Sequence, residues 1–414
     1  MNFKKIIKYM TMILVFAFGL PAYGQIYKYV DAKGKVVYSD KPVPGSTGLA
    51  TTTMTGLSSV AGGGNGLNAN KSINDANSLP KTKWNPGHYL LIYPQGKEGD
   101  RLHARYMDEV IRDISINPGF QGIQKQYSWN KLEPAKGMYD FSQIRRDLDA
   151  LAEVNKRLVI SLQERSFING EKLVPSYLLT PEYEGGVYSF NDGKGYNAIY
   201  WNDKVQDRLV ALVTEMGKQL DGHPNLEAIN FEETSNGIKA KDPREKFTNS
   251  YYAGVVRVAL AAKKAFPSTV VIQYINYAAW SLDKVVNQLV AAGVGVGGPD
   301  VSEKDLHLAK ASYPYFTKVS GTVPIGVAVQ WWNYETNNGE KTGAKPSIAS
   351  IHAFAQNGLK ANYIFWLRRS QDKKNGPDYF QNVLSHFKTI NWSVDQYGGL
   401  DGKCPKALVN CTSK

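Results

Sequence analysis

The sequence predicts an α/β protein whose main part is a (β/α)8 TIM barrel, preceded by a small β-hairpin module and a flexible linker. Two observations predict the barrel. From residue 84 to residue 395, short apolar runs alternate with amphipathic stretches, making about eight β/α units. No glycine-rich phosphate-binding turn follows the first run, where Tyr93-Pro94-Gln95-Gly96 stands, and this argues against a doubly wound open sheet.

Residues 1–24 have the pattern of an export signal. Three lysines precede an apolar stretch from Met10 to Leu20, and Ala22-Tyr23-Gly24 offers a small-x-small cleavage site. The apolar stretch is short for a membrane span, and a retained N-terminal anchor is the alternative. We expect a periplasmic or secreted protein with no stable membrane span after cleavage.

Residues 25–48 are predicted to form the β-hairpin module. Aromatic and β-branched residues alternate with polar ones on both sides of Asp31-Ala32-Lys33-Gly34. The pattern of an aromatic strand, an Asp-x-x-Gly turn, Tyr38-Ser39-Asp40 and a closing proline resembles a small domain of unknown function. That domain follows the signal peptide in many exported proteobacterial proteins, so the resemblance implies an envelope location and no chemistry.

Residues 49–83 are predicted to be the linker. The segment consists mainly of Gly, Ser, Thr, Asn and Ala. Such a composition buries too little apolar surface to offset the entropy lost on ordering. We therefore expect a flexible tether.

The barrel is predicted from strands that are short and apolar and from helices that are amphipathic. The predicted strands are His88–Pro94, Gly122–Tyr127, Arg157–Gln163, Leu226–Asn230, Thr269–Tyr274, Gly293–Gly297, Pro324–Gln330 and Ala361–Trp366. The predicted helices are Phe141–Asn155, Val205–Leu220, Tyr251–Ala265, Leu282–Ala292, Ser347–Gln356 and Tyr379–Ile390.

Residues 396–414 are predicted to be a C-terminal tail that holds both cysteines of the chain, Cys404 and Cys411. An exported protein meets an oxidising compartment, so these two residues are expected to form a local disulfide. The six histidines show no metal-ligand spacing. We expect neither a metal nor another cofactor.

The chain is basic, with a formal net charge of +12 that falls to +9 without the three signal lysines. Such an excess favours anionic partners, for example an acidic polysaccharide. A generally basic surface is the alternative. The sequence lacks the arginine- and aromatic-rich motifs of nucleic-acid readers, so no nucleic-acid partner is expected.

Acidic, amide and aromatic residues gather where the predicted strands end, and in a parallel barrel these ends form the active face. The fourth strand runs into Glu232-Glu233-Thr234-Ser235. A catalytic acid is expected here, with a helix cap or a surface lysine pair as the alternative. Other residues expected at this face are Gln126, Tyr127, Trp129, Gln163, Glu164, Tyr277, Asp300, Gln330, Trp331, Trp332, Glu335 and Trp366. Rings that stack on sugar faces and groups that bind hydroxyls together predict a carbohydrate substrate.

Two motifs carry a resemblance to barrel glycoside hydrolases that have their general acid on strand four. Gln126-Tyr127-Ser128-Trp129, followed by the stretch from Leu132-Glu133-Pro134 to Phe141, resembles their signature after strand two. The strand-four motif is similar to the Asn-x-x-Glu-Thr of a poorly characterised bacterial group. The resemblance implies hydrolysis of a glycosidic bond with Glu233 as general acid. Glu232 is then expected to point away, because neighbouring strand residues face opposite sides.

The seventh strand departs from the family pattern. Its nucleophile position holds Gln330, and an amide can neither form a glycosyl ester nor act as a base. We favour Glu164 as the second carboxylate, because Arg165 would keep it ionised. A structural carboxylate paired with arginine is the alternative for Glu164. Asp300 and Glu335 are the other candidates, and Asp300 could instead cap a helix.

The sequence thus predicts an exported glycoside hydrolase that acts on an envelope or extracellular polysaccharide or oligosaccharide. Two other classes remain open. One is a carbohydrate-binding barrel that lost its nucleophile at Gln330. The other is an assembly partner of an envelope complex.

Overall fold

The computed structural model describes residues 27–30, 36–39, 81–93, 101–190, 195–238, 241–277, 279–336, 345–368, 379–408 and 410–412. The chain divides into two units, residues 1–72 and residues 73–414, which we describe separately. The predicted signal peptide and the predicted linker up to residue 80 lie outside the described residues.

The first unit contains the two strands of the predicted hairpin. Strand β1 (Tyr27–Val30) pairs antiparallel with β2 (Val36–Ser39). Tyr27 lies opposite Ser39, and Val30 lies opposite Val36. The strands therefore flank the predicted turn at residues 31–34.

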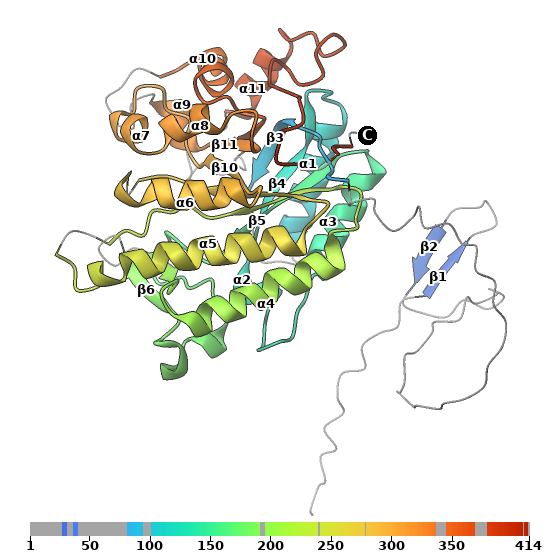
Figure 1. The fold of residues 1–414 in the computed structure, drawn as a ribbon. Coiled ribbons are helices and arrows are strands. Elements are labelled where there is room, and N and C mark those ends of the chain that lie inside the picture. Colours follow the sequence, from blue (N-terminus) through green and yellow to red (C-terminus); the bar gives the residue numbers. More distant parts are fainter. Residues whose placement is uncertain are drawn as a thin grey trace, which may run out of the picture. The chain divides into compact units, whose positions relative to one another are not determined.

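The second unit is a closed barrel of parallel strands, as the sequence predicts (Figure 1). Neighbouring strands follow the order β10-β11-β12-β3-β4-β5-β8-β9. The bounds are β3 (Gly87–Ile92), β4 (Phe120–Ser128), β5 (Arg157–Gln163), β8 (Leu226–Phe231), β9 (Val270–Tyr274), β10 (Gly295–Gly298), β11 (Ile325–Val329) and β12 (Tyr363–Arg368). Each of the eight predicted strands overlaps one of these.

Helices connect the strands and cover the outside of the barrel. The longer ones are α1 (Arg101–Ser115), α3 (Ser142–Glu153), α4 (Asp203–Leu220), α5 (Thr248–Ala265), α6 (Ala279–Ala291) and α11 (Phe380–Phe387). Shorter ones are α2 (Trp129–Leu132), α7 (Leu306–Ala311), α8 (Tyr313–Val319), α9 (Trp331–Glu335) and α10 (Ile348–Ala353). Helices α4, α5 and α6 lie side by side (Figure 1). Among the described residues, no helix combines the length and apolarity that a membrane span needs.

Helix α4 shows how the sequence builds one of these covers. The side chain of Asn202 accepts hydrogen bonds from the backbone N–H groups of Lys204 and Val205, at 2.9 and 3.1 Å, and so caps the helix. Leu209, Leu212 and Met216 recur at helical spacing and are buried. The helix therefore turns one apolar stripe towards the strands.

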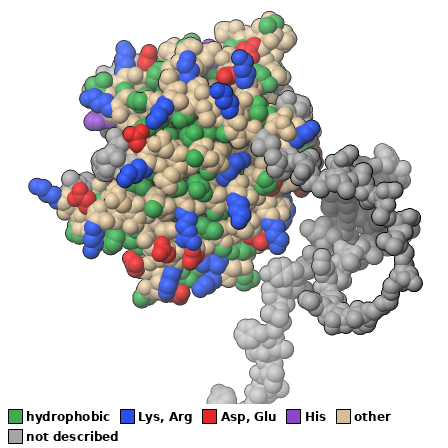
Figure 2. All heavy atoms as spheres, viewed as in Figure 1, with side chains coloured by type: hydrophobic (Ala, Val, Ile, Leu, Met, Phe, Trp, Pro, Cys, Tyr) green, Lys and Arg blue, Asp and Glu red, His purple; other side chains and the backbone are tan. Residues whose placement is uncertain are grey.

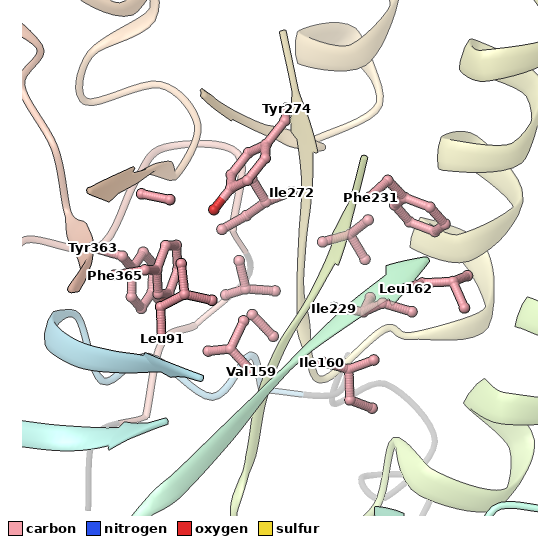
Figure 3. Packing of buried hydrophobic residues seen from close by; sticks show 14 of the residues in the cluster. Leu91, Val159, Ile160, Leu162, Ile229, Phe231, Ile272, Tyr274, Tyr363 and Phe365 are labelled. Carbon is pink, nitrogen blue, oxygen red and sulfur yellow. The ribbon is translucent and has the colours of Figure 1, made fainter. Parts of the chain in front are cut away.

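The apolar core has an inner and an outer part (Figure 3). Inner side chains fill the barrel, and a methyl group at Gly326 would come within 3.0 Å of Ile272 and Phe365. Outer side chains such as Leu162 and Phe231 lie on the side of the helices. The barrel is thus a packed core, and any site must lie at one of its ends.

One end of the barrel, which we call the base, is closed by a buried polar cluster. Glu227 accepts hydrogen bonds from the backbone and side-chain nitrogens of Asn85, at 2.7 and 2.8 Å, and from the Tyr363 hydroxyl, at 2.7 Å. Arg157 lies 3.7 Å from the same carboxylate. These charged residues stabilise the structure at the N-terminal ends of the strands.

The C-terminal tail packs on the base. The Trp84 indole donates to the backbone oxygen of Gly402 at 2.8 Å, and the Asn362 side chain donates to that of Asp401 at 2.8 Å. The predicted disulfide is present, with 5.9 Å between the Cα atoms of Cys404 and Cys411. The backbone of Thr412 donates to that of Thr82 at 2.9 Å, so the last residues of the predicted linker pair with the tail.

A β-hairpin that the sequence analysis did not predict follows the third barrel strand. Strands β6 (Val187–Phe190) and β7 (Gly195–Ala198) pair antiparallel. They lie between β5 and α4 in the chain, at the end of the barrel where the strands finish. This hairpin supplies part of the site described next.

Candidate active site

The C-terminal ends of the eight strands meet at the end of the barrel opposite the base, which we call the mouth. Gln163 ends β5, Glu232 and Glu233 follow β8, and Gln330 follows β11. Tyr277 and Asp300 follow β9 and β10. The parallel arrangement therefore brings these predicted site residues to one end of the molecule.

Glu233 is held by groups from both neighbouring strands. The Arg165 guanidinium, after β5, lies 3.0 Å from one carboxylate oxygen, and the Asn276 amide, after β9, donates to the other. Burial raises the pKa of Glu233, while Arg165 and Asn276 oppose that rise. The side chain of Glu233 thus has a fixed orientation and a raised proton affinity.

The loops that carry Glu233 and Asn276 are locked together. The Thr234 hydroxyl donates to the backbone oxygen of Asn276 at 2.8 Å and accepts from its backbone N–H at 3.0 Å. The backbone N–H of Ser235 donates to the Asn276 side chain at 2.9 Å. Thr234 and Ser235 therefore position the acid that precedes them.

Arg165 is itself fixed by the β6–β7 hairpin and α5. Its guanidinium donates to the Tyr251 hydroxyl at 2.8 Å, and the Asn197 side chain donates to the same hydroxyl at 3.0 Å. Tyr188 then links the hairpin to the loop after β8 by donating to the backbone oxygen of Asn236 at 2.6 Å. The hairpin thus supports the Arg165–Glu233 pair.

Asp300 is a second buried carboxyl near Glu233. It accepts hydrogen bonds from the Trp332 indole and from the Asn333 side chain, the latter at 3.3 Å. Burial and the charge of Glu233 raise the pKa of Asp300 to about 7, against the opposing effect of these two donors. The charge of Glu233 therefore affects the ionisation of Asp300.

Asp300 is not a helix cap, which corrects the alternative drawn from the sequence. Helix α7 begins at Leu306, and Asp305 caps it by accepting from the backbone N–H groups of His307 and Leu308 at 2.9 and 3.0 Å. Asp300 thus remains available for another role.

Tyr277 lies beside the carboxyl pair. Burial and the charges of Asp300, Asp305 and Glu233 raise the pKa of its hydroxyl. Its φ of +31° is unusual for a residue other than glycine. Such a backbone conformation is often kept at a functional site, where it aims a side chain.

Glu232 does not point away from this cluster, contrary to the sequence-based expectation. The Gln163 side chain donates a hydrogen bond to its carboxylate. Burial and the charge of Glu164, together with that of Glu233 and against that of Arg165, raise the pKa of Glu232 to about 8. Strand β8 ends at Phe231. The rule that neighbouring strand residues face opposite sides therefore does not apply to Glu232 and Glu233, which lie beyond the strand.

Gln330 occupies the end of β11 at the mouth. Its side-chain oxygen accepts a hydrogen bond from the Tyr93 hydroxyl, and its backbone N–H donates to the Asn333 side chain at 2.7 Å. The amide carries no titratable proton, so Gln330 can orient a ligand but cannot act as an acid or base.

Glu164, the second carboxylate favoured from the sequence, is only 2% exposed. It is hydrogen-bonded to Tyr200, and burial raises its pKa to about 7, with Arg165 opposing. One of its carboxylate oxygens is buried without a hydrogen-bond partner. Arg165 favours the ionised form of Glu164, as expected, but burial outweighs that effect, and the guanidinium forms its ion pair with Glu233.

Three aromatic residues predicted to bind substrate are instead buried in the core. The Tyr127 hydroxyl donates to Asp147 of α3. The Trp129 indole donates to Glu133 at 2.9 Å, and the Trp366 indole donates to His88 at 2.9 Å. Both indoles are fully buried, which corrects the prediction that they stack on sugar.

The signature that follows Trp129 builds a turn. Glu133 is fully buried and accepts hydrogen bonds from the Trp129 indole, from the backbone N–H of Gly137 at 2.8 Å, and from Arg208 of α4. Gly137 has a φ of +75°, which favours glycine. These residues therefore fix the connection between β4 and α3.

The remaining predicted residues differ in their surroundings. Glu335 pairs with Lys345 at 2.7 Å and accepts from the Tyr379 hydroxyl, and these bonds lower its pKa. Trp331 is 41% exposed, and its ring centroid lies 5.7 Å from that of Trp332. Gln126 is partly exposed near the end of β4, and its contact with substrate stays a prediction.

Sequence reasoning missed two tyrosines at the mouth. Tyr93 follows β3 and donates to Gln330, as described above. Tyr274, the last residue of β9, accepts from Gln124 at 3.0 Å, and burial raises the pKa of its hydroxyl, with a contribution from the charge of Glu232. Tyr274 is the last residue of its predicted strand and Tyr93 the last but one, and these positions were the signal that could have found them.

Comparisons with known proteins agree with both units. The sequence family described as a domain of unknown function (DUF4124) matches residues 13–61. No curated protein matches the sequence.

Three solved structures share the barrel. The β-galactosidase of the psychrophilic Marinomonas ef1 matches with a TM-score of 0.52 and 9% identity, over 76% of this chain and 61% of that one. The cold-adapted β-galactosidase of Rahnella sp. R3 gives 0.52 and 10%, over 77% and 58%. The β-amylase catalytic domain of Paenibacillus polymyxa gives 0.50 and 9%, over 74% and 99%.

The barrel is of the kind found in these glycoside hydrolases. The chain spans about three-fifths of the length of the two β-galactosidases. At such low identity the likeness establishes the fold, and function has to be argued from the site.

Proposed function

We propose that the protein is an exported glycoside hydrolase that cleaves a glycosidic bond in an envelope or extracellular polysaccharide or oligosaccharide. The observation that carries this proposal is the carboxyl pair at the mouth. Glu233 and Asp300 follow strands β8 and β10, both are largely buried, and the charge of Glu233 raises the pKa of Asp300 to about 7. Two interacting carboxyl groups are what glycoside hydrolysis uses.

In the proposed reaction, Glu233 protonates the leaving oxygen. Burial favours its protonated form, and Asn276 and Arg165 fix the direction in which the carboxyl points. Asp300, as the carboxylate, attacks the anomeric carbon or takes a proton from the attacking water. The charge of Glu233 favours the proton on Asp300, so the reaction proceeds from the other arrangement of the pair, with the proton on Glu233 and Asp300 ionised.

Asp300 is a better partner for Glu233 than Glu164, which the sequence favoured. The Asp300 carboxyl receives its hydrogen bonds from Trp332 and Asn333, and the former residue adjoins the exposed Trp331 at the mouth. Glu164 is 2% exposed and bonded to Tyr200. A nucleophile or base has to reach the sugar, and Asp300, which is 9% exposed, is the more accessible of the two.

The proposal includes export, and the charge of the chain favours an anionic substrate. Export is supported by the signal pattern of residues 1–24 and by the match of residues 13–61 to a domain that resembles those of exported proteins. Among the described residues visible in Figure 2, lysine and arginine side chains are spread over the face instead of gathered in one patch. The net charge, +12 for the whole chain and +9 without the three signal lysines, is therefore the support for an acidic polymer.

A carbohydrate-binding barrel without activity is the second candidate. Gln330 favours a binding barrel. Its amide stands at the end of the seventh strand, where the resemblance to glycoside hydrolases implies a nucleophilic carboxylate. Such a protein would use the same mouth to hold a sugar and would release no product.

The test is a screen of the purified protein and its Glu233→Gln variant against soluble polysaccharides and aryl glycosides, with reducing ends and product anomers read by NMR. We expect the parent to release sugar and the variant to lose at least about a hundredfold in rate while still binding. Unchanged turnover in the variant would contradict the role of Glu233. Binding by both proteins without product would favour the binding barrel.

A further inference from the structure

Exposed apolar side chains lie on two opposite sides of the mouth. Phe167 and Ile168, in the loop after β5, are 56% and 65% exposed. Trp331, after β11, is 41% exposed. Strands β5 and β11 are four places apart in the closed barrel, whether counted through β8, β9 and β10 or through β4, β3 and β12. The two groups therefore face each other across the mouth.

Each group adjoins one of the proposed catalytic carboxyls. The Arg165 guanidinium, which pairs with Glu233, lies 6.0 Å from the centre of the Phe167 ring. The Trp331 ring lies 5.7 Å from that of Trp332, whose indole donates to Asp300. Strands β8 and β10, which carry the two carboxyls, lie between β5 and β11 in the barrel order. The carboxyl pair is thus placed between the two apolar groups.

Phe167 is held in place although more than half of it is exposed. Its ring packs edge-on against Phe190 of β6, with 5.3 Å between centroids. Phe190 in turn contacts the loop after β8, where a methyl group at Gly237 would come within 2.9 Å of it. The inserted hairpin therefore presents a fixed apolar surface beside Glu233.

Single exposed apolar residues are common on proteins and need no explanation by themselves. What distinguishes these is that they form fixed, exposed surfaces on both sides of a pair of buried carboxyls. Pyranose rings present C–H faces that pack on aromatic and aliphatic surfaces, while their hydroxyls need polar partners of the kind that Gln163 and Tyr277 provide.

We infer that the mouth binds a sugar chain with residues on both sides of the bond to be cleaved, one side resting on Phe167 and Ile168 and the other on Trp331. The inference rests on the proposed function and extends it from a bond type to a substrate class. The substrate is a polymer or long oligosaccharide that is cut internally, because a site that served only chain ends would need an apolar surface on one side of the carboxyls alone.

The test uses the full protein, a panel of soluble polysaccharides and 4-nitrophenyl β-galactoside as a short probe. Four variants are compared with the parent, namely Phe167→Ala, Ile168→Ala, Trp331→Ala and the control Ile116→Ala. Ile116 is 72% exposed and follows α1, at the base. Ile168→Ala and Ile116→Ala thus remove the same atoms from exposed positions at opposite ends of the barrel. Product sizes early in the reaction, and retardation of each protein in polysaccharide gels, are measured in parallel.

We expect the parent to release fragments of intermediate size first. For Phe167→Ala and Trp331→Ala, the ratio of kcat/KM on polymer to that on the short probe should fall about tenfold, the scale of one lost stacking contact. A smaller fall is expected for Ile168→Ala, and none for Ile116→Ala. Early release of single sugars alone, or an equal ratio in all four variants, would overturn the inference.

The outcomes also separate this inference from the proposed function. The protein could cleave no substrate and yet be retarded in a polysaccharide gel, with that retardation lost in Phe167→Ala and Trp331→Ala. This outcome would support the chain-binding surfaces and contradict hydrolysis. Cleavage of the short probe with no binding or cleavage of any polymer would overturn the surfaces and keep hydrolysis. A parent that neither binds nor cleaves any probe would overturn both.

Discussion

Arg165 sets the electrostatic character of the candidate site at the scale of single residues. Its buried guanidinium touches Glu233 at 3.0 Å and donates to the Tyr251 hydroxyl at 2.8 Å, which ties the acid to the inserted hairpin and α5. A buried charge without its partner is costly, so Arg165 and Glu233 stabilise each other as well as the site.

Arg165→Gln should move the pH dependence of activity. Arg165 lowers the pKa of Glu233 against the effect of burial, so removing its charge raises that pKa. A general acid must be protonated, so activity falls as the pH rises through its pKa. The descending limb of kcat/KM is therefore expected to move up by about one pH unit.

The measurement is a kcat/KM profile against pH for the parent, Arg165→Gln and Arg165→Lys. The lysine variant keeps a positive charge and should move the limb less. Arg145→Gln, at an exposed position on α3, serves as the control. If the descending limb of the Arg165→Gln profile stays at the same pH or moves to lower pH, Glu233 is not the group whose ionisation causes the loss of activity.

The side-chain directions at the mouth are what the sequence could not supply. Tyr127, Trp129 and Trp366 are near strand ends, as Gln163 and Gln330 are, yet the three aromatic residues point into the outer core. In a parallel barrel both faces of a strand are buried, so hydrophobic alternation does not tell the inward face from the outward one. Position along the strand was predictable, and direction was not.

At the scale of elements, the strands were predictable because each is a short apolar run bounded by polar segments. All eight predicted runs overlap observed strands. The β6–β7 hairpin escaped prediction because Gly195-Tyr196-Asn197-Ala198 lacks the alternation and β-branched residues of a strand. That hairpin is held by its contacts with the loop after β8, which are tertiary.

The turn between β4 and α3 is expected to depend on Glu133 for its stability. Glu133→Ala removes the acceptor of the Trp129 indole and of the Gly137 N–H, and it leaves Arg208 without its carboxylate. Breaking a buried ion pair from one side costs about 3–5 kcal/mol. We expect a loss of that size in the free energy of unfolding, measured by denaturant titration.

Glu182→Ala is the matched control for this turn. Glu182 is exposed and lies 3.9 Å from Lys136, an ion pair that solvent screens. We expect little change in its unfolding midpoint. Equal midpoints for Glu133→Ala and Glu182→Ala would contradict the structural role that the contacts of Glu133 indicate.

In the whole molecule, the second unit carries a stabilising polar cluster at one end of the barrel and the candidate site at the other. The base is closed by Glu227 and its partners and covered by the disulfide-bonded tail. The mouth gathers Glu233, Asp300 and the amides from strands that are far apart in the sequence. The sequence predicted the mouth, because the C-terminal ends of the strands in a parallel barrel meet at one face, but it did not predict the cluster at the base.

The proposed mechanism requires Asp300, and not Glu164, to work with Glu233. The most direct test compares Asp300→Asn with Glu164→Gln, each an isosteric loss of a carboxylate, by the initial rate of reducing-end release from one substrate. We expect a loss of at least about a hundredfold in Asp300→Asn and a far smaller one in Glu164→Gln. A loss in Glu164→Gln as large as in Glu233→Gln, with Asp300→Asn near the parent rate, would contradict that mechanism.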